Sequence, residues 1–128
     1  MMKELTNELI DMIEKNEWVI FSTSDVNNNP HAIIVLTSRV EKNRIILSNI
    51  QMNKSIENVM SNPKCFINAY IKDKDDVQIK INCTAEVYDD GELYHEIKEY
   101  EETNNLPEDL KVRSIIVANI DNVEVSEG

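Results

Sequence analysis

Lys54 and Ser55 stand at the start of a short amphipathic segment and together could bind an anion. Residues 48–63 read as the end of an apolar strand, a polar loop and a short helix whose first turn contains the lysine. A helix start leaves backbone N–H groups unpaired and carries partial positive charge, so it suits a phosphate. The alternative is a solvated lysine, although a cation in the first turn opposes the helix dipole.

The composition predicts one globular domain, spanning residues 1–128. The chain is 41% hydrophobic and 29% charged, with 24 acidic and 13 basic residues and a net charge of -11. This acidity argues against nucleic acid as a partner, because a phosphate backbone would be repelled. No apolar run approaches the roughly 20 residues that span a bilayer. The polar N-terminus does not read as a signal peptide, so the sequence predicts a cytoplasmic protein without membrane contact.

Several classes of site have no support in the sequence. Only 2 glycines are present, which excludes a glycine-rich phosphate loop and a dinucleotide fingerprint. Cys65 and Cys83 lie in separate apolar runs, so we expect buried free thiols. His31 and His95 lack metal-ligand spacing, and no metal site is predicted. For His31, at the start of a strand, a structural role is favoured over proton transfer.

Hydrophobic periodicity predicts helices and strands that can position the Lys54 segment. Helical spacing predicts helices over residues 5–15, from Lys54 to Pro63, and over 92–102. Apolar runs predict strands over 18–23, 31–40, 44–48, 65–71 and 77–88, and a sixth strand at 115–118 within the closing segment 112–125. Successive hairpins favour an antiparallel sheet. The continuous apolar run 33–36 predicts a second strand buried on both faces.

The third predicted helix is strongly acidic. Asp89 and Glu92 have the spacing of a capping box, which predicts a helix start at Asp89. Leu93, Ile97 and Tyr100 are predicted to form its apolar face. The acidic residues of this helix are expected to form a solvated face.

Three stretches together carry a family resemblance. KSIENVMSNPK at 54–64 resembles a Lys-(Thr/Ser)-x-x-Asn-(Leu/Val)-x-x-(Asn/Asp)-Pro signature, and WVIFSTSD at 18–25 followed by NPH at 29–31 resembles a first hairpin. INCTAEV at 81–87 resembles a strand that ends in Gly-x-Ala, with Cys83 in place of the glycine. This signature and the order of elements resemble the pyridoxamine 5′-phosphate oxidase-like flavin-binding family, especially its small single-domain members. The resemblance implies a mainly β fold with flanking helices, a six-stranded antiparallel split β-barrel of the FMN-binding type.

The resemblance also implies a binding site for FMN at a homodimer interface. The phosphate would contact Lys54, Ser55 and the backbone of the preceding loop, formed by Asn49, Ile50, Gln51, Met52 and Asn53. The isoalloxazine ring would lie along the second and third strands, near Ile34, Val35, Leu36, Thr37 and Ser48. A flat apolar surface with a few hydrogen-bonding groups suits such a ring, and a lysine suits its phosphate.

Some positions depart from the family pattern or leave alternatives open. Many members have glycines in the loop where this chain has Asn49, Gln51 and Asn53, whose side chains either crowd the phosphate or supply donors. The basic residues that bind pyridoxal phosphate in the true oxidase have no match, so that reaction is not carried over. Arg39 and Arg44 either help to neutralise the phosphate or are ordinary surface charges.

Two classes of function are therefore expected. The first is a homodimeric FMN-dependent reductase or oxidase that acts on a small molecule or electron donor, with the flavin carrying the hydride. No catalytic side chain is assigned, because the flavin would supply the chemistry. The second is a non-enzymatic module of the same fold. It would be an electron carrier, a scaffold without flavin, or a protein that uses a deazaflavin or haem.

Overall fold

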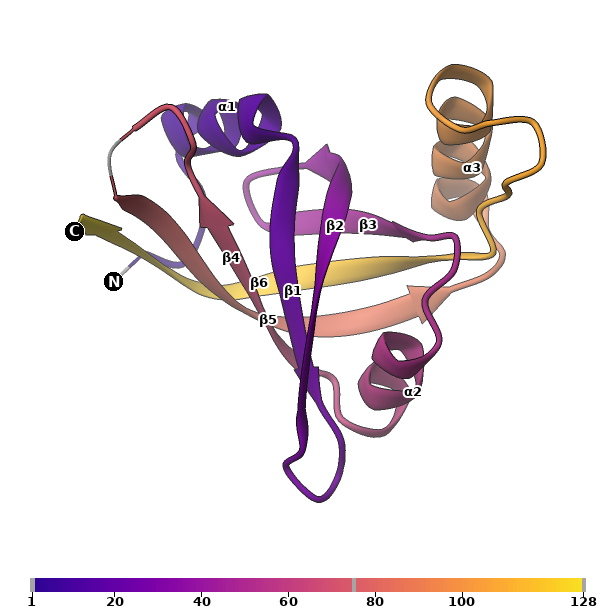
Figure 1. Cartoon of the computed structure of the whole chain (residues 1–128), viewed down its shortest axis with the longest axis horizontal. Coiled ribbons are helices and arrows are strands. Elements are labelled where there is room, and N and C mark those ends of the chain that lie inside the picture. The colour runs from indigo at the N-terminus through magenta and orange to yellow at the C-terminus, as the bar shows by residue number, and fades with distance from the viewer. Residues whose placement is uncertain (1, 75, 128) are drawn as a thin grey trace.

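Six antiparallel strands form a barrel in the computed structural model, which describes residues 2–74 and 76–127. Their order around the barrel is β1-β2-β3-β6-β5-β4 (Figure 1). The strands are β1 (Trp18–Ser24), β2 (Pro30–Val40), β3 (Arg44–Asn49), β4 (Lys64–Tyr70), β5 (Val77–Tyr88) and β6 (Ser114–Glu127). The first five lie within a few residues of their predicted positions, while β6 extends well beyond the predicted 115–118. The predicted six-stranded antiparallel barrel is confirmed.

Three helices complete the fold: α1 (Asn7–Asn16), α2 (Lys54–Ser61) and α3 (Glu92–Asn104). α1 and α2 lie at opposite ends of the barrel, and α3 lies beside it (Figure 1). α1 begins after Thr6, whose hydroxyl accepts a hydrogen bond from Leu9 N at 3.2 Å, as expected for a helix N-cap. Among the described residues, no helix combines the length and the hydropathy needed to cross a bilayer.

Period-two alternation along the strands divides the apolar residues between two clusters. Ile45 and Leu47 point into the barrel and join the interior cluster, which also contains Phe21. Ile46 points outward and packs with Tyr94 and Ile97 of α3. The second cluster therefore fixes α3 against the outer surface of β3 and β6.

The start of α3 and its apolar face differ from the prediction. The helix begins at Glu92 after Gly91, which has a φ of 95° and makes no side-chain capping bond, so the capping box at Asp89 is wrong. The buried stripe contains Tyr94, Ile97 and Glu101, whereas Tyr100 is 55% exposed. Of the predicted face, Ile97 is buried and Leu93 packs against the same cluster, but the stripe continues through Glu101, a residue that apolar spacing alone does not select.

The prediction that β2 is buried on both faces is wrong for this chain taken alone. Ile34 and Leu36 point away from the barrel and are 71% and 66% exposed. Their neighbours Ile33 and Val35 pack against the interior cluster. A continuous apolar run indicates that both faces of a strand are apolar. It does not indicate whether residues of the same chain cover both faces.

The two cysteines face each other inside the barrel. Cys65 and Cys83 are partners in the β4–β5 register, and both are free and buried, as predicted. A hydrogen bond with Cys65 and the apolar surroundings raise the pKa of the Cys83 thiol. Both effects disfavour the Cys83 thiolate, and both cysteines are buried, so neither has the exposed setting of a reactive thiol.

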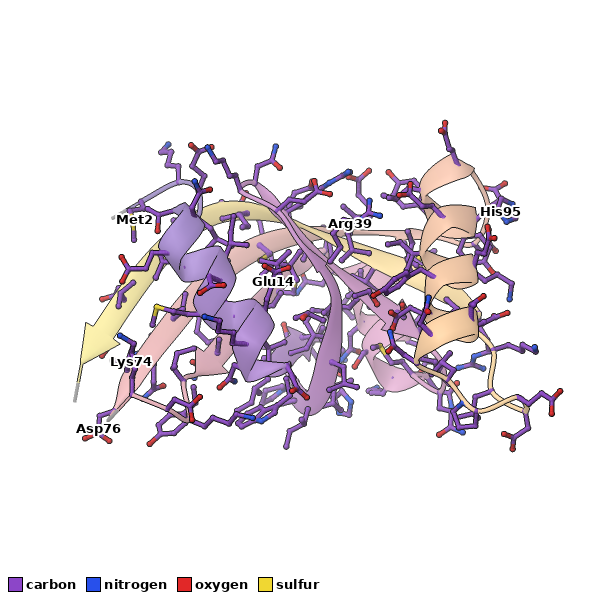
Figure 2. All side chains as sticks on the ribbon, turned by 90° about the horizontal axis from the view of Figure 1, so that it is seen from above. Met2, Glu14, Arg39, Lys74, Asp76 and His95 are labelled. Carbon is purple, nitrogen blue, oxygen red and sulfur yellow. The ribbon has the colours of Figure 1, made fainter. Side chains whose placement is uncertain are left out.

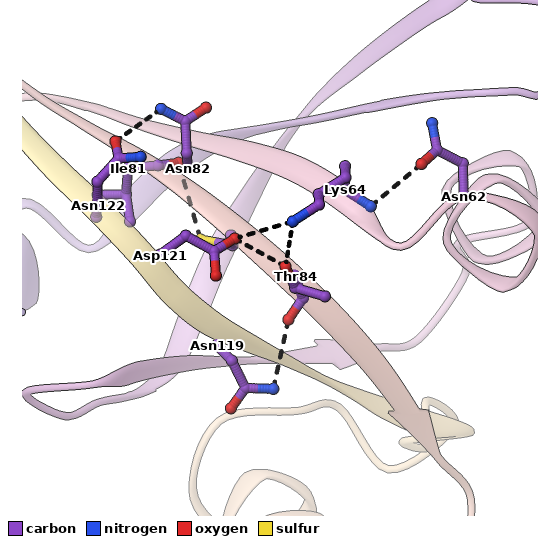
Figure 3. Close-up of polar contacts among 9 residues, drawn as sticks. Asn62, Lys64, Ile81, Asn82, Thr84, Asn119, Asp121 and Asn122 are labelled. Atoms are coloured by element: carbon purple, nitrogen blue, oxygen red, sulfur yellow. Dashed lines mark hydrogen bonds and ion pairs between the residues drawn. The ribbon is translucent and has the colours of Figure 1, made fainter. Parts of the chain in front are cut away.

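A polar network covers the outer surface where β4, β5 and β6 meet (Figure 3). The β5–β6 register shifts between Asn82 and Cys83. Next to this shift, the Thr84 hydroxyl donates to Asp121 Oδ2 at 2.7 Å and accepts from Lys64 Nζ at 3.1 Å. These exposed contacts contribute little to stability, but they make this side of the barrel hydrophilic.

Candidate functional site

The barrel is split along one edge of β2. β2 pairs with β1 over residues 30–36 and with β3 only over residues 37–40. Over residues 30–36 its other side therefore has no strand neighbour in the described chain. An unpaired strand edge presents free backbone N–H and C=O groups. These groups can bind the polar rim of a flat molecule.

A cavity of about 520 Å³ opens beside this edge. β2 and the end of β3 form one wall, residues 50–55 form a second, and the end of α3 closes a third side. Its lining residues are His31, Ile33, Ile34, Val35, Leu36, Ser38, Ser48, Ile50, Gln51, Met52, Asn53, Lys54, Ser55, Glu101, Asn105 and Leu106. The volume falls in the range of small-molecule and cofactor sites, about 300–1,000 Å³.

The start of α2 presents unsatisfied donors to this cavity. Asn53, the N-cap residue, makes no side-chain capping bond. The Ser55 side chain is buried, with 1% exposure, and its hydroxyl has no hydrogen-bond partner among the described residues. A buried hydroxyl without a partner costs free energy, which makes Ser55 a candidate ligand contact.

The Lys54 ammonium is available for a ligand at the same point. No carboxylate forms an ion pair with it in the described part of the chain. Asp25 lies in the β1–β2 turn, and hydrogen bonds from Asn29 lower the pKa of its carboxyl group. The positive charge of Lys54 lowers this pKa further, to a smaller extent. The helix end therefore combines a free cation, a free hydroxyl and uncapped N–H groups.

The crossover loop, residues 49–53, is held by side chains rather than by glycines. Asn49 Oδ1 accepts a hydrogen bond from Met52 N at 2.7 Å, and Asn49 Nδ2 donates to Ser114 Oγ at 2.9 Å. Arg113 Nη2 donates to Met52 O at 2.9 Å. No residue of this loop has a positive φ, so the backbone does not need the conformational freedom of glycine.

Loss of the Arg113 side chain is expected to loosen the crossover loop. Arg113→Gln removes the bond to Met52 O and the longer contacts at 3.4 Å to the side chains of Asn49 and Asn53. Hydrogen–deuterium exchange should then rise in peptides that cover residues 50–53, with little change in the barrel strands. Lys111→Gln, an exposed basic residue two positions earlier, is the control and should leave loop exchange unchanged. Equal exchange in both variants would show that the arginine does not brace the loop.

Most of the residues predicted for the site line this one cavity. Only Asn49 and Thr37 do not: Asn49 is buried behind the loop, and Thr37 N donates to Glu17 O at 3.2 Å beside α1. Arg39 and Arg44 also lie outside the lining. Arg39, which is labelled in Figure 2, pairs through Nη2 with Glu96 Oε1 of α3 at 2.6 Å, and Arg44 Nε pairs with Glu41 Oε1 at 2.8 Å.

Four polar residues of the cavity were not predicted as site residues: His31, Ser38, Glu101 and Asn105. His31 lies on the same face of the β1–β2 hairpin as Thr23, its register partner, whose hydroxyl accepts from Asn58 Nδ2 of α2 at 3.0 Å. Glu101 and Asn105 come from the end of α3. One signal in the sequence could have identified Glu101. It follows Tyr94 and Ile97 at helical spacing, so it places a carboxylate in an apolar stripe.

Solved structures of other proteins share this fold. The HupZ protein of Group A Streptococcus superposes with a TM-score of 0.83 at 14% identity, covering 97% of this chain and 95% of that one. An FMN-binding protein from Syntrophomonas wolfei gives a TM-score of 0.73 at 18% identity, covering 93% and 84%. An F420 reductase gives 0.72 at 14% identity, covering 94% and 98%. At these identities the likeness establishes the fold alone.

Sequence comparison identifies the family. An uncharacterized protein of Methanocaldococcus jannaschii is 29% identical over 120 residues, which cover 91% of this chain and 77% of that protein. The family model described as pyridoxamine 5′-phosphate oxidase matches residues 5–126, nearly the whole chain. The predicted family resemblance is confirmed. With its barrel, its split edge and its cavity at the start of α2, this chain belongs to the pyridoxamine 5′-phosphate oxidase family.

Proposed function

We propose that this chain is an FMN-binding flavoprotein that acts as an oxidoreductase on a small molecule. The supporting observation is the unpartnered Ser55 hydroxyl, buried at the uncapped start of α2 beside the free Lys54 ammonium. A phosphate dianion fits this donor set, because it accepts from N–H, O–H and ammonium groups at once. Membership of a family that includes FMN-binding proteins supports the same assignment.

The remaining walls of the cavity suit the ring of FMN. Ile33, Ile34 and Val35 supply an apolar floor, and the unpaired edge of β2 supplies backbone donors and acceptors. Ser48 and Ser38, joined by a hydrogen bond of 2.6 Å between their hydroxyls, add polar groups at the far end. When bound, FMN would supply hydride or electron transfer. The side chains of this chain would bind it, orient it and limit the access of water.

We propose that two copies of the chain pair through an apolar outer face. β1, β2 and β4 turn Trp18, Ile20, Ile34, Leu36, Phe66 and Tyr70 outward, and Tyr70 is 41% exposed. In the middle of this face, Asn68 Oδ1 is buried and accepts no hydrogen bond from the described residues. Ile34 and Leu36 also line the cavity, so a second copy would cover its open side.

The proposal can be tested by spectroscopy of the purified protein. Flavin absorbance, release of FMN on denaturation and one FMN bound per chain would support it. Protein that takes up no added FMN would contradict it. The fold is shared with an F420 reductase, so the same titration should include that deazaflavin. Preference for the deazaflavin would replace FMN in the proposal. A bound flavin that no reduced nicotinamide reduces would favour an electron carrier over a reductase.

Ser55→Ala should separate ligand binding from stability. Removing an unpartnered buried hydroxyl should leave the ligand-free protein as stable as before or slightly more stable. FMN affinity should fall by roughly tenfold, because one hydrogen bond to the charged phosphate is lost. Isothermal titration with FMN and urea unfolding measure the two effects. Ser61→Ala, on the same helix, is the control and should not change affinity, because that hydroxyl bonds to Glu57 O and Asn58 O.

A further inference from the structure

Glu101 is a charged residue at a position of helix α3 where an apolar side chain is expected. It continues the buried stripe of Tyr94 and Ile97, and only 9% of it is exposed. No other charged side chain of the described residues is buried. Glutamate is almost never buried without a partner, because taking a carboxylate out of water is costly. Its presence in the stripe therefore calls for a function other than packing.

The charge of Glu101 has no counter-charge within the described chain. Glu101 Oε1 accepts a hydrogen bond from Asn105 Nδ2 at 2.9 Å. The neighbouring Glu102 takes the available cation, because Lys98 Nζ donates to its Oε2 at 2.5 Å, and Val112 N donates to the same oxygen at 2.8 Å. Glu101 instead lines the cavity, where it can accept further hydrogen bonds from a ligand.

Glu101 and Lys54 occupy different ends of the cavity. α2 is tied to the start of β2 through Asn58 and Thr23, the register partner of His31. α3 is tied to the end of β2, because Glu96 pairs with Arg39. At about 3.3 Å per residue, His31 and Ser38 lie roughly 23 Å apart along that strand. The crossover loop runs between α2 and α3 in Figure 1. A molecule with its phosphate at Lys54 would therefore direct its other end toward Glu101.

We propose that Glu101 accepts a hydrogen bond from an N–H group of the flavin ring and lowers the reduction potential of that ring. This inference rests on the proposed FMN binding. The isoalloxazine ring carries an N–H donor on its polar edge, and the carboxylate is the charged acceptor at that end of the cavity. Reduction adds electron density to the ring, which a nearby negative charge opposes. The cavity thus pairs a cationic end for the phosphate with an anionic end for the ring.

The reduction potential of bound FMN tests this assignment directly. Glu101→Gln removes the charge but keeps an oxygen that can accept from Asn105, so the fold should be retained. Glu99→Gln removes a charge from the exposed side of the same helix and serves as the matched control. Glu101→Gln should shift the potential of bound FMN to more positive values, while Glu99→Gln should match the wild type. Equal potentials in the two variants would overturn the proposal.

Lumiflavin, the isoalloxazine ring with a methyl group in place of the ribityl phosphate, separates this inference from the phosphate site. Wild-type protein should bind lumiflavin roughly tenfold more tightly than Glu101→Gln, because a charged acceptor is replaced by a neutral one. If lumiflavin shows this difference but FMN binds no more tightly than lumiflavin, Glu101 keeps its role and the phosphate site is contradicted. Equal lumiflavin affinity in wild type and Glu101→Gln, or no lumiflavin binding, would overturn the role of Glu101 even if FMN binds.

Discussion

Lys54→Ala is expected to weaken FMN binding by roughly ten- to a hundredfold. A hydrogen bond to a charged group contributes about 1.5–3 kcal/mol, and about 1.4 kcal/mol corresponds to a factor of ten in affinity. The Lys54 side chain is exposed and has no ion-pair partner in the described chain, so its loss should not damage the core. Removing a cation from the first turn of α2 should even relieve a small repulsion with the helix dipole. Fluorescence titration with FMN measures the affinity, and urea unfolding measures the stability.

The design includes two comparison variants. Lys54→Arg retains the positive charge and should recover much of the lost affinity. Lys72→Ala removes an exposed lysine outside the cavity lining and should bind FMN as the wild type does. Raising the salt concentration should reduce the difference between wild type and Lys54→Ala, because ions screen an exposed charge. If Lys54→Ala binds FMN as tightly as the wild type, the phosphate does not lie at the start of α2.

Leu36→Glu is expected to convert a dimer into a monomer. Leu36 is 66% exposed in the single chain, and burying a leucine contributes about 1.5–3 kcal/mol. In a twofold-symmetric pair the substitution acts twice, and each copy would also place an unpaired carboxylate in an apolar contact. Sedimentation velocity over a range of concentrations measures the state of association. FMN affinity should fall in parallel, because Leu36 also lines the cavity.

Val26→Glu provides the matched control for this experiment. Val26 is 69% exposed but lies in the turn between β1 and β2, away from the apolar outer face. It should leave both association and FMN binding unchanged. Wild-type protein that sediments as a monomer at all concentrations would remove the proposed interface. A dimer that survives Leu36→Glu would place the contact on another surface.

The strands could be predicted because buried and exposed residues alternate along them, and the sequence shows the same alternation of apolar and polar residues. In β5, Ile79, Ile81 and Cys83 are buried and alternate with more exposed Lys80 and Asn82, as the sequence pattern indicated. The burial of β2 could not be predicted, because the sequence does not distinguish a face covered by the same chain from a face left for another molecule. The exposure of Ile34 and Leu36 is therefore information that only the structure supplies.

Site residues that are consecutive in the sequence could be predicted. Site residues that come from distant helices and strands could not. Residues 50–55 form one wall of the cavity, and their polar loop and helix start could be recognised directly. Glu101, Asn105 and Leu106 reach the cavity only because the outer surface of β3 and β6 holds α3 in place through Tyr94 and Ile97. That packing depends on which face of α3 turns toward the barrel, and the sequence pattern predicted this face only in part. Arg113 was missed because its partners in the crossover loop lie far from it in the sequence.

The open edge of β2 also has a consequence for the behaviour of the protein in a crowded solution. A free strand edge is a template on which another chain can add a strand and begin to aggregate. Here α2 and the crossover loop line the far side of the same cavity, and Lys54 lies at its rim. A helix and a charged side chain in this position block an incoming polypeptide, because a strand needs the space beside the whole edge. The cavity thus leaves room for a small molecule, while the elements that line it hinder edge-to-edge addition of a foreign strand to β2.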